Sequence, residues 1–494
     1  TLAYVVESPH EKGVIWTGSD DGLVHLTRDG GATWKNVTPP RLAECLINAI
    51  EVSPFDPGTA YIATTRYKFN DHAPGLYKTT NYGASWTRID KGIPGNAFTR
   101  VVREDDVRRD LLYAGTERGV YLSWNGGKDW SPFQLNLPVT PITDLRVHQG
   151  NLIAATSGRA FWILDDLSLV RQYQRDRPAF SIYKPGNAYL VNGGSELDQR
   201  DNDDNAEAEF KGADTFNGVN PATGIVVYYQ LPELQKDDEI TLEVSDAQGR
   251  TIRTFSSKAV PDQKKWEGGP KPEPVLTKVK GLNRFVWDMR YPTMTGVPDA
   301  YFENSYAGHK AVPGKYRFTL KSGDQTLTTD AEILANPLYS IDAAGYQAYH
   351  TLMSGMEAEL SAMHQRVNEL HDKQTQLEAL LAKLPAEDKS STVRTEGEAL
   401  LAKLKAWDED MVQRKSKAYD DVENFPNKFT ASYLFLINQA ESSLPQVNAS
   451  TLEQLQILNA QWATLKARSE ELLNKDIPSM NNRLWQAGYG ALWQ

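Results

Sequence analysis

Apolar residues recur at alternating steps of three and four through the last third of the chain. After Tyr349 this seam comprises Met353, Met356, Leu360, Met363, Val367, Leu370, Leu377, Leu381 and Leu384, and only Gln374 interrupts it. The same stagger resumes with Val393, Leu400, Leu404, Trp407 and Met411. Such spacing gives a helix one apolar stripe, as in coiled coils and helical bundles. Because Pro385 and a polar stretch separate the two seams, the pattern predicts an antiparallel helical hairpin.

Two later stretches, residues 428–442 and 450–473, keep a helical period and are expected to add helices to this bundle. The first helix, of about 40 residues, should be roughly 60 Å long at the standard rise. Met353, Met356 and Met363 are expected in the bundle core, although Met side chains also suit adaptable partner surfaces.

The middle of the chain alternates apolar and polar residues with a period of two. This alternation runs through GIVVYYQL, EITLEVSDAQGRTIRTF, GLNRFVWDMRY and GKYRFTLKSGDQTLTTDAEIL, with DAQG and KSGD as turns. A strand of this kind has one buried and one solvated face. Residues 223–336 are therefore predicted to form a β-sandwich. A linker rich in Asn, Asp and Gly is expected before it, at 173–222.

The first third contains an internal repeat. Three octets align, TRDGGATW at 27–34, TTNYGASW at 79–86 and SWNGGKDW at 123–130, and their starts lie 52 and 44 residues apart. Each octet follows β-rich sequence, and the intervals are close to the length of one four-stranded propeller blade. The repeat therefore predicts successive blades.

The residue types of the octet suit a tight turn. Asp or Asn accepts backbone N–H groups, Gly permits an unusual φ, and Trp packs the hairpin down. We therefore predict structural roles for Asp29, Gly31, Trp34, Asn81, Gly83, Trp86, Asn125, Gly127 and Trp130. On these octets the chain resembles the Asp-box (BNR-repeat) β-propeller proteins of the glycosyl-hydrolase-like or sortilin-like family. In that family the Asp-box lies on an outer hairpin, away from the central face where ligands bind.

Residues 141–172 lack the octet but keep the strand rhythm. They resemble the final blade of the same family, in which a Gly-Arg and aromatic segment precedes an Asp pair, here Gly158, Arg159, Phe161, Trp162, Asp165 and Asp166. Four blades are thus visible, whereas propellers of this type more commonly have seven. We expect the remaining blades to come from polypeptide outside this chain, either the upstream part of the same precursor or another subunit.

The phrases NPATG, GLNRFVWDMRYP and AVPGKYRFTL resemble the immunoglobulin-like module that follows the propeller in this family. The expected fold class is multidomain, mainly β and then α. It comprises a partial Asp-box β-propeller of about four blades at 1–172, the linker, an immunoglobulin-like β-sandwich at 223–336, and an antiparallel helical bundle or coiled coil at 337–494. The resemblance implies an extracytoplasmic location, periplasmic or secreted, with the signal upstream of Thr1.

Charge and composition exclude several classes of protein. The formal net charge of −11 disfavours nucleic acid as a partner, because binding to phosphates needs clustered Lys and Arg. The sequence has no apolar run of about 18 residues that would span a bilayer. Its single cysteine, Cys45, is without a second cysteine for an internal disulfide and is expected to be a small buried hydrophobe.

Common catalytic motifs are missing from the sequence. It contains no GxSxG, HExxH, GxxxxGK[ST] or dinucleotide glycine pattern. The sequence therefore lacks the usual motifs of serine hydrolases, zinc proteases and nucleotide-binding enzymes. Glycoside hydrolysis needs two carboxylates about 5 to 9.5 Å apart and stays open. The candidate carboxylates are Asp20, Asp21, Asp71, Asp144 and Asp166. A sialidase would also need an arginine cluster, which Arg66 and Arg159 are too few to establish.

The insert TTRYKFNDHAPGLYKTT, at 64–80, is longer than a hairpin needs. Polar and aromatic side chains on a loop held by a rigid blade suit ligand binding. The candidate binding residues are Arg66, Tyr67, Asn70, Asp71 and His72, together with Arg159 and Trp162. The expected function is a noncatalytic propeller scaffold that binds a glycan or protein partner. The alternative is a glycoside hydrolase whose carboxylate pair is shared with the missing blades.

No cofactor is expected, and calcium is the one ion considered. Oxygen ligands are offered by Asp198, Asp201, Asp203, Asp204, Glu207 and Glu209. An EF-hand loop needs Gly at its sixth position and Glu at its twelfth, and this segment has Ala206 and Gly212 there. A solvated loop is therefore the favoured interpretation.

Overall fold

The computed structural model describes residues 1–199, 218–260, 264–384, 392–442 and 445–489, which fall into two compact units. Among the described residues, Thr1–Arg177 form the first unit and those from Pro178 onward form the second. None of the described helices is both long enough and apolar enough to cross a bilayer. The domain limits expected from the sequence stay predictions.

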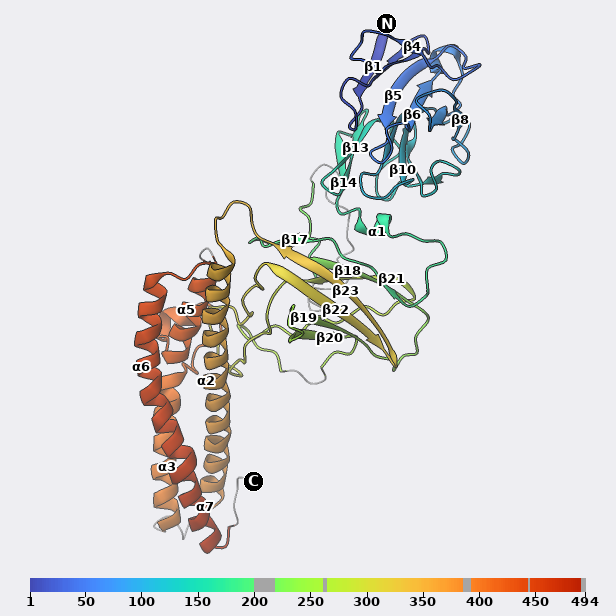
Figure 1. Cartoon of the computed structure of the whole chain (residues 1–494). Coiled ribbons are helices and arrows are strands. Elements are labelled where there is room, and N and C mark those ends of the chain that lie inside the picture. The colour runs from blue at the N-terminus through green and yellow to red at the C-terminus, as the bar shows by residue number, and fades with distance from the viewer. Residues whose placement is uncertain (200–217, 261–263, 385–391, 443–444, 490–494) are drawn as a thin grey trace. The chain divides into compact units, whose positions relative to one another are not determined.

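The first unit consists of four successive antiparallel sheets, here called blades 1 to 4 (Figure 1). Blade 1 contains β1 (Leu2–Glu7), β2 (Ile15–Ser19), β3 (Val24–Thr27) and β4 (Lys35–Asn36). Blade 2 contains β5 (Leu46–Val52), β6 (Ala60–Thr65), β7 (Leu76–Thr79) and β8 (Thr87–Arg88). Blade 3 contains β9 (Thr99–Glu104), β10 (Leu112–Thr116), β11 (Gly119–Ser123) and β12 (Ser131–Pro132). Blade 4 contains β13 (Ile142–His148), β14 (Asn151–Thr156) and β15 (Phe161–Leu164), followed by a short helix, α1 (Ser168–Arg171).

Neighbouring blades pack through their first strands. Strand β5 lies against β1 and β9, and β9 lies against β13. Glycine permits this close approach, since a Cβ at Gly18 would lie 2.4 Å from Ile47 Cγ2 and one at Gly115 would lie 2.7 Å from Ile142 Cγ2. Successive up-and-down sheets that pack in this way form a propeller-like fold, as the repeat predicts. The number of blades in a complete ring stays a prediction.

The second unit begins with two sheets packed over one core. One sheet has the order β16 (Ser181–Ile182), β18 (Ile225–Leu231) and β21 (Gly281–Trp287). The other has the order β17 (Ala188–Tyr189), β23 (Gln325–Leu334), β22 (Gly314–Ser322), β19 (Ile240–Ser245) and β20 (Thr251–Ser256). The alternating residues of both sheets, such as Val227 and Phe318, are fully buried in the same cluster. The longer strands lie where the alternation of apolar and polar residues predicts them. The immunoglobulin-like assignment stays a prediction.

The predicted linker differs from the structure in its first half. Strands β16 and β17 lie within 173–222 and pair with β18 and β23. Each is only two residues long, which is too short for a period-two pattern to reveal.

The described residues after the sandwich form a helical bundle (Figure 1). Its helices are α2 (Ala343–Lys383), α3 (Thr392–Met411), α5 (Phe429–Ser442), α6 (Ala449–Glu471) and α7 (Ile477–Gln486), with a short α4 (Asp421–Asn424) and a π-helical turn, η3 (Leu472–Asp476). Helix α7 continues α6 and packs against α3. Helix α2 begins earlier than its apolar seam because the Asp342 side chain accepts the Gly345 N–H at 2.8 Å and caps it. The predicted C-terminal helical region is confirmed.

The two predicted seams face each other in an antiparallel pair. Near the connection, Gly397 of α3 packs on Leu381 of α2, and farther along Lys405 Nζ lies 2.8 Å from Glu378 Oε1. Met353, Met356 and Met363 are at most 2% exposed and belong to the bundle core.

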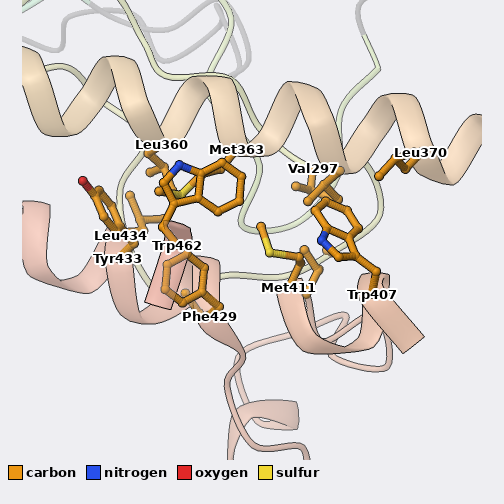
Figure 2. Close-up of a cluster of buried hydrophobic side chains, with 14 of the residues drawn as sticks. Val297, Leu360, Met363, Leu370, Trp407, Met411, Phe429, Tyr433, Leu434 and Trp462 are labelled. Atoms are coloured by element: carbon orange, nitrogen blue, oxygen red, sulfur yellow. The ribbon is translucent and has the colours of Figure 1, made fainter. Parts of the chain in front are cut away.

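This core also contains part of the sandwich. Figure 2 shows Val297 beside Trp407 and Met411 of α3, while Leu360 and Met363 of α2 lie over Trp462. Val297 comes from the segment that follows β21, and neighbouring residues of that segment enter the same cluster. The segment after β21 therefore packs into the bundle core, while the sandwich strands keep a core of their own within the same compact unit.

Candidate functional site

The three octets form the same hydrogen-bonded turn. The hydroxyl of the first residue, Thr27, Thr79 or Ser123, accepts the N–H of the octet glycine at 2.9, 3.0 and 2.9 Å respectively. The Asp or Asn then accepts the N–H four residues further on at 2.9, 2.9 and 3.2 Å. Asp29 additionally accepts the Thr33 hydroxyl at 2.6 Å, and these bonds lower the pKa of its carboxyl to about 2. All bonds are local, so the octet shapes its own hairpin.

The octet tryptophans dock on the preceding blade. Trp86 Nε1 donates to the Val37 carbonyl of blade 1 at 2.7 Å, and Trp130 Nε1 donates to the Ile89 carbonyl of blade 2. Val37 and Ile89 occupy equivalent positions, since each directly follows the last strand of its blade, β4 or β8. Trp34 is instead 46% exposed, and no described blade lies before blade 1. Its predicted packing on its own hairpin stays a prediction.

The predicted binding loops lie at the opposite end of the blades from the octets. Each octet joins the third strand of its blade to the fourth, whereas residues 66–75 and 157–160 join the second strand to the third. In an up-and-down sheet these two kinds of hairpin are at opposite ends. The topology therefore places Arg66–His72 and Arg159 together with Asp20 and Asp21, at the end of the unit that we call the loop end.

The loop at 66–72 is held by its own side chains. Arg66 Nη1 lies 3.2 Å from Asp71 Oδ2, and Arg66 Nε donates to the Glu44 carbonyl at 3.0 Å. A single 3-10 turn, η1 (Tyr67–Phe69), follows Arg66 and ends at Asn70, whose φ is 57°. Asp71 also accepts the Ala73 N–H at 3.1 Å. Arg66 and Asp71 therefore fix the loop, while its aromatic side chains are presented outward.

An aromatic platform lies beneath this loop. Tyr67 stacks on Phe98 with ring centroids 5.4 Å apart, and His72 lies 5.9 Å from the same ring. Arg100 covers Phe98 at 5.1 Å and pairs with Glu117 at 2.6 Å. Phe98 is 4% exposed and Tyr67 is 43% exposed, so the buried ring supports an accessible one. The sequence analysis did not single out Phe98, Arg100 or Glu117, because they come from blade 3.

The remaining predicted residues lie apart from this platform. Trp162 Nε1 donates to the Arg159 carbonyl at 2.8 Å within blade 4, and no contact among the described residues joins this pair to the loop at 66–72. The carboxylates of Asp20 and Asp21 bond to Thr1 and Ser19 respectively. Asp166 accepts the Ser168 N–H at 2.9 Å before α1. Asp21 and Asp166 therefore serve local turns, and Asp20 pairs with the amino group of Thr1.

Asp144 alone of the candidate carboxylates reaches a cluster between blades. Arg103 of β9 is 8% exposed in its side chain, and its Nη2 lies 2.7 Å from Asp144 Oδ1 of β13 and 3.2 Å from the Tyr4 hydroxyl of β1. Its Nη1 lies 3.4 Å from Glu51 Oε2 of β5. The first strands of all four blades therefore converge on one guanidinium. Burial raises the pKa of Glu51 to about 7, despite the opposing charge of Arg103.

Neither Glu51 nor Arg103 was predicted as a site residue. Both lie inside strands whose alternation marks them only as one face of a sheet. The convergence of four strands on one side chain is a property of blade packing, which no local pattern encodes.

The acidic segment considered for calcium falls mainly outside the described residues. Asp201, Asp203, Asp204, Glu207 and Glu209 are not described. Asp198 is described, and its carboxylate accepts the N–H groups of Ser195 and Thr223 at 2.8 and 2.6 Å. Within the described ranges, no three His, Cys, Asp or Glu side chains are arranged to hold a metal ion. Cys45 is fully buried, and burial raises the pKa of its thiol to about 11.

No protein-family model and no curated protein matches the chain. Among solved structures, the chain is similar to YCF48 from Cyanidioschyzon merolae, with 16% identity over 67% of this chain and 94% of that one, at a TM-score of 0.27. YCF48 bound to a D1 peptide matches with 18% identity over 39% of this chain and 66% of that one, at a TM-score of 0.26. The GH74 xyloglucanase from Xanthomonas campestris matches with 13% identity over 70% of this chain, at a TM-score of 0.28. The chain spans 47% of the xyloglucanase's length. Likenesses this distant carry no argument about function.

Proposed function

We propose that the first unit is a noncatalytic binding scaffold whose open blade face associates with a further β-blade. The observation that supports this proposal is the different surroundings of one repeated residue. The octet tryptophans of blades 2 and 3 each donate to a backbone carbonyl of the preceding blade. The indole of Trp34 is instead 46% exposed.

The surroundings of the octet glycines differ between the blades in the same way as those of the tryptophans. A Cβ at Gly83 would lie 2.6 Å from Val37 Cβ, and one at Gly127 would lie 2.7 Å from Ile89 Cδ1. At Gly31 the only atoms within 4 Å belong to Trp34. Blade 1 thus carries both halves of an interblade contact, an exposed indole and a glycine that meets no residue of another blade.

Exposed apolar residues extend this face. Leu2 and Val5 of β1 are 58% and 54% exposed, whereas the buried faces of β5 and β9 contact neighbouring blades. Blade 4 shows the same feature at the other end of the series, where Phe161 and Ile163 are 77% and 59% exposed. Large exposed apolar side chains in a row indicate a protein interface. The partner we propose is a β-blade with a backbone carbonyl after its last strand, from the upstream part of the same precursor or from another subunit.

Site-specific photocrosslinking tests this partner. A photoreactive phenylalanine at position 34, introduced into the chain in its native host, should give one discrete crosslinked polypeptide, to be identified by mass spectrometry. The matched control is position 128, because Lys128 is an exposed residue of the third octet. The proposal would be overturned if neither position crosslinks to another polypeptide and light scattering shows that the chain is a monomer.

The loop end is the proposed contact for a glycan or peptide ligand. Tyr67 is the accessible ring of the platform, and Asp71 fixes the loop through Arg66. Tyr67→Ala should weaken ligand binding without unfolding blade 2, because the side chain is 43% exposed. Phe69→Ala is the matched control, since Phe69 is 52% exposed and forms no ring stack on Phe98. An unchanged affinity for every ligand in Tyr67→Ala and Asp71→Ala would remove this loop from the site.

Glu51 is the observation that favours the second candidate function, glycoside hydrolysis. A carboxyl with a pKa of about 7 suits a general acid, and Asp144 lies on the other side of the same arginine. A screen of polysaccharides and chromogenic glycosides should give turnover that Glu51→Gln abolishes. If no substrate is turned over, the glycoside hydrolase proposal is contradicted and the binding scaffold is the one proposed function that is left.

A further inference from the structure

A charged cleft in the second unit is not part of the proposed scaffold site. It has a volume of about 750 Å³ and lies where the sandwich meets helix α5. Arg253 of β20 and Asp288, which follows β21, form one wall, and Arg290, Lys310 and Glu441 form another. Volumes of this size are typical of sites for small ligands.

Most charges in the cleft are neutralised within the protein. Arg253 Nη1 lies 3.0 Å from Asp288 Oδ1, and its Nη2 pairs with Glu273. Arg290 Nη1 lies 2.6 Å from Glu441 Oε1 and donates to the Gly308 carbonyl at 2.7 Å. Two ion pairs therefore stand on the cleft walls, each with carboxylate oxygens and guanidinium N–H groups.

Lys310 is the exception. Its Nζ donates to the Val191 carbonyl, and it forms no ion pair with any carboxylate that the structure describes. Burial lowers the pKa of Lys310 and the positive charge of Arg290 lowers it further, while the carboxylates of Glu441, Asp288 and Asp198 act in the opposite direction. A partly buried ammonium that lacks a direct ion pair keeps part of its desolvation penalty, and a bound anion would reduce it.

A second, smaller hollow adjoins Lys310. Lys310 and Glu441 line it together with three tyrosines, Tyr339, Tyr346 and Tyr349. Its volume of about 30 Å³ corresponds to roughly two water-sized groups. The Tyr346 hydroxyl is buried there without a hydrogen-bond partner among the described residues. A small acceptor group placed in this hollow would reach both the ammonium and the hydroxyl.

We propose that this cleft binds an acidic sugar, with a carboxylate at Lys310 and ring hydroxyls at the two ion pairs. Hydroxyl groups both donate and accept, so they can bond to the carboxylates of Asp288 and Glu441 and to the neighbouring guanidinium groups. A polyacidic peptide offers those carboxylates its backbone N–H groups, but its side chains lack a hydroxyl that both donates and accepts. One carboxylate per sugar ring matches the one ammonium of Lys310, which forms no ion pair with a described carboxylate.

Calorimetry of the full chain with a galacturonate trimer tests the proposal. The trimer should bind, and its methyl ester, which carries no charge and one added methyl group on each carboxyl, should bind at least tenfold more weakly. Lys310→Met keeps the aliphatic stem without the charge and should weaken binding of the acid at least tenfold. Lys236→Met is the matched control, because Lys236 is exposed outside the cleft and binding should be unchanged.

A second measurement uses only the wild-type chain. The pKa of Lys310, followed by NMR of its labelled Cε, should rise when the acidic trimer is saturating. Circular dichroism checks the fold of Lys310→Met, and Lys310→Arg should retain binding.

Three outcomes would overturn the acidic-sugar site. The first is that acid and ester bind equally, and the second is that Lys310→Met binds like wild type. The third is that inorganic phosphate or a glutamate tripeptide binds while neither galacturonate nor glucuronate trimers do. These results concern the second unit alone, so they leave the scaffold proposal for blade 1 untouched.

Discussion

The first and third octets have the same turn and opposite surroundings. Thr27 and Ser123 make equivalent hydrogen bonds to Gly31 and Gly127 at 2.9 Å. Yet the tryptophan that ends the first octet is 46% exposed and the one that ends the third is 4% exposed. The turn is therefore encoded within eight residues, whereas burial of the indole depends on a neighbouring blade.

The largest expected effect separates the two tryptophans. Trp130→Ala should destabilise blade 3 by about 3–5 kcal/mol, because it removes a buried aromatic side chain and its bond to Ile89. Trp34→Ala should change the stability of blade 1 in the isolated chain by less than about 1 kcal/mol. Hydrogen exchange with mass spectrometry of the full chain reads each blade separately. Equal loss of protection in both variants would contradict the comparison.

The octet glycines should give the next largest difference. Gly31 and Gly127 have φ values of +99° and +88°, so alanine at either position is strained by about 1–2 kcal/mol. A methyl group at Gly127 also meets Ile89, which should add about 1–3 kcal/mol from overpacking. Gly127→Ala should therefore be clearly more destabilising than Gly31→Ala. Hydrogen exchange with mass spectrometry again measures the loss of protection in each blade. Equal destabilisation by Gly31→Ala and Gly127→Ala would mean that the octet of blade 1 is covered in the isolated chain.

The hydroxyls that open the octets should behave alike. Thr27→Val and Ser123→Ala each remove one buried hydroxyl that bonds within the turn, and each should cost about 1 kcal/mol. Because these bonds are local, the absence of a neighbouring blade should make no difference. A gap larger than about 1 kcal/mol between the two variants would show that blade packing alters the turn itself.

The smallest effect concerns acid stability. The Thr33 hydroxyl and backbone, with Thr27, lower the pKa of Asp29 to about 2 from 3.8. A carboxyl with a depressed pKa stabilises the fold above its unfolded pKa, and this contribution disappears as the pH falls from about 4 to about 2. Asn81 holds the same position in the second octet and does not titrate.

Blade 1 should therefore lose protection in this pH window more than blade 2, by a small amount because Asp29 is exposed. Asp29→Asn should remove the difference. NMR titration of the Asp29 carboxyl provides an independent reading. A midpoint near 4 would show that the turn does not hold the charged form.

The sequence by itself determined the local structure of this protein. The seam from Met353 to Leu384 defines the buried face of α2, because a step of three or four residues places side chains on one stripe of a helix. The alternation in 225–231 and 314–322 defines the sandwich strands for the equivalent reason with a period of two. The octets define their turns because the bonds made by the opening hydroxyl and by the Asp or Asn side chain join residues at most four apart.

Only the tertiary structure decided the sites. Phe98 supports Tyr67 because blade 3 packs on blade 2, and four strands bring Tyr4, Glu51 and Asp144 to Arg103. Lys310 and Glu441 line one cleft although their positions are 131 residues apart in the sequence. Contacts of this range depend on how whole elements pack, and a short window of sequence does not record which element will lie opposite. The exposed indole of Trp34 and the unpaired ammonium of Lys310 follow from that packing rather than from any pattern in the chain.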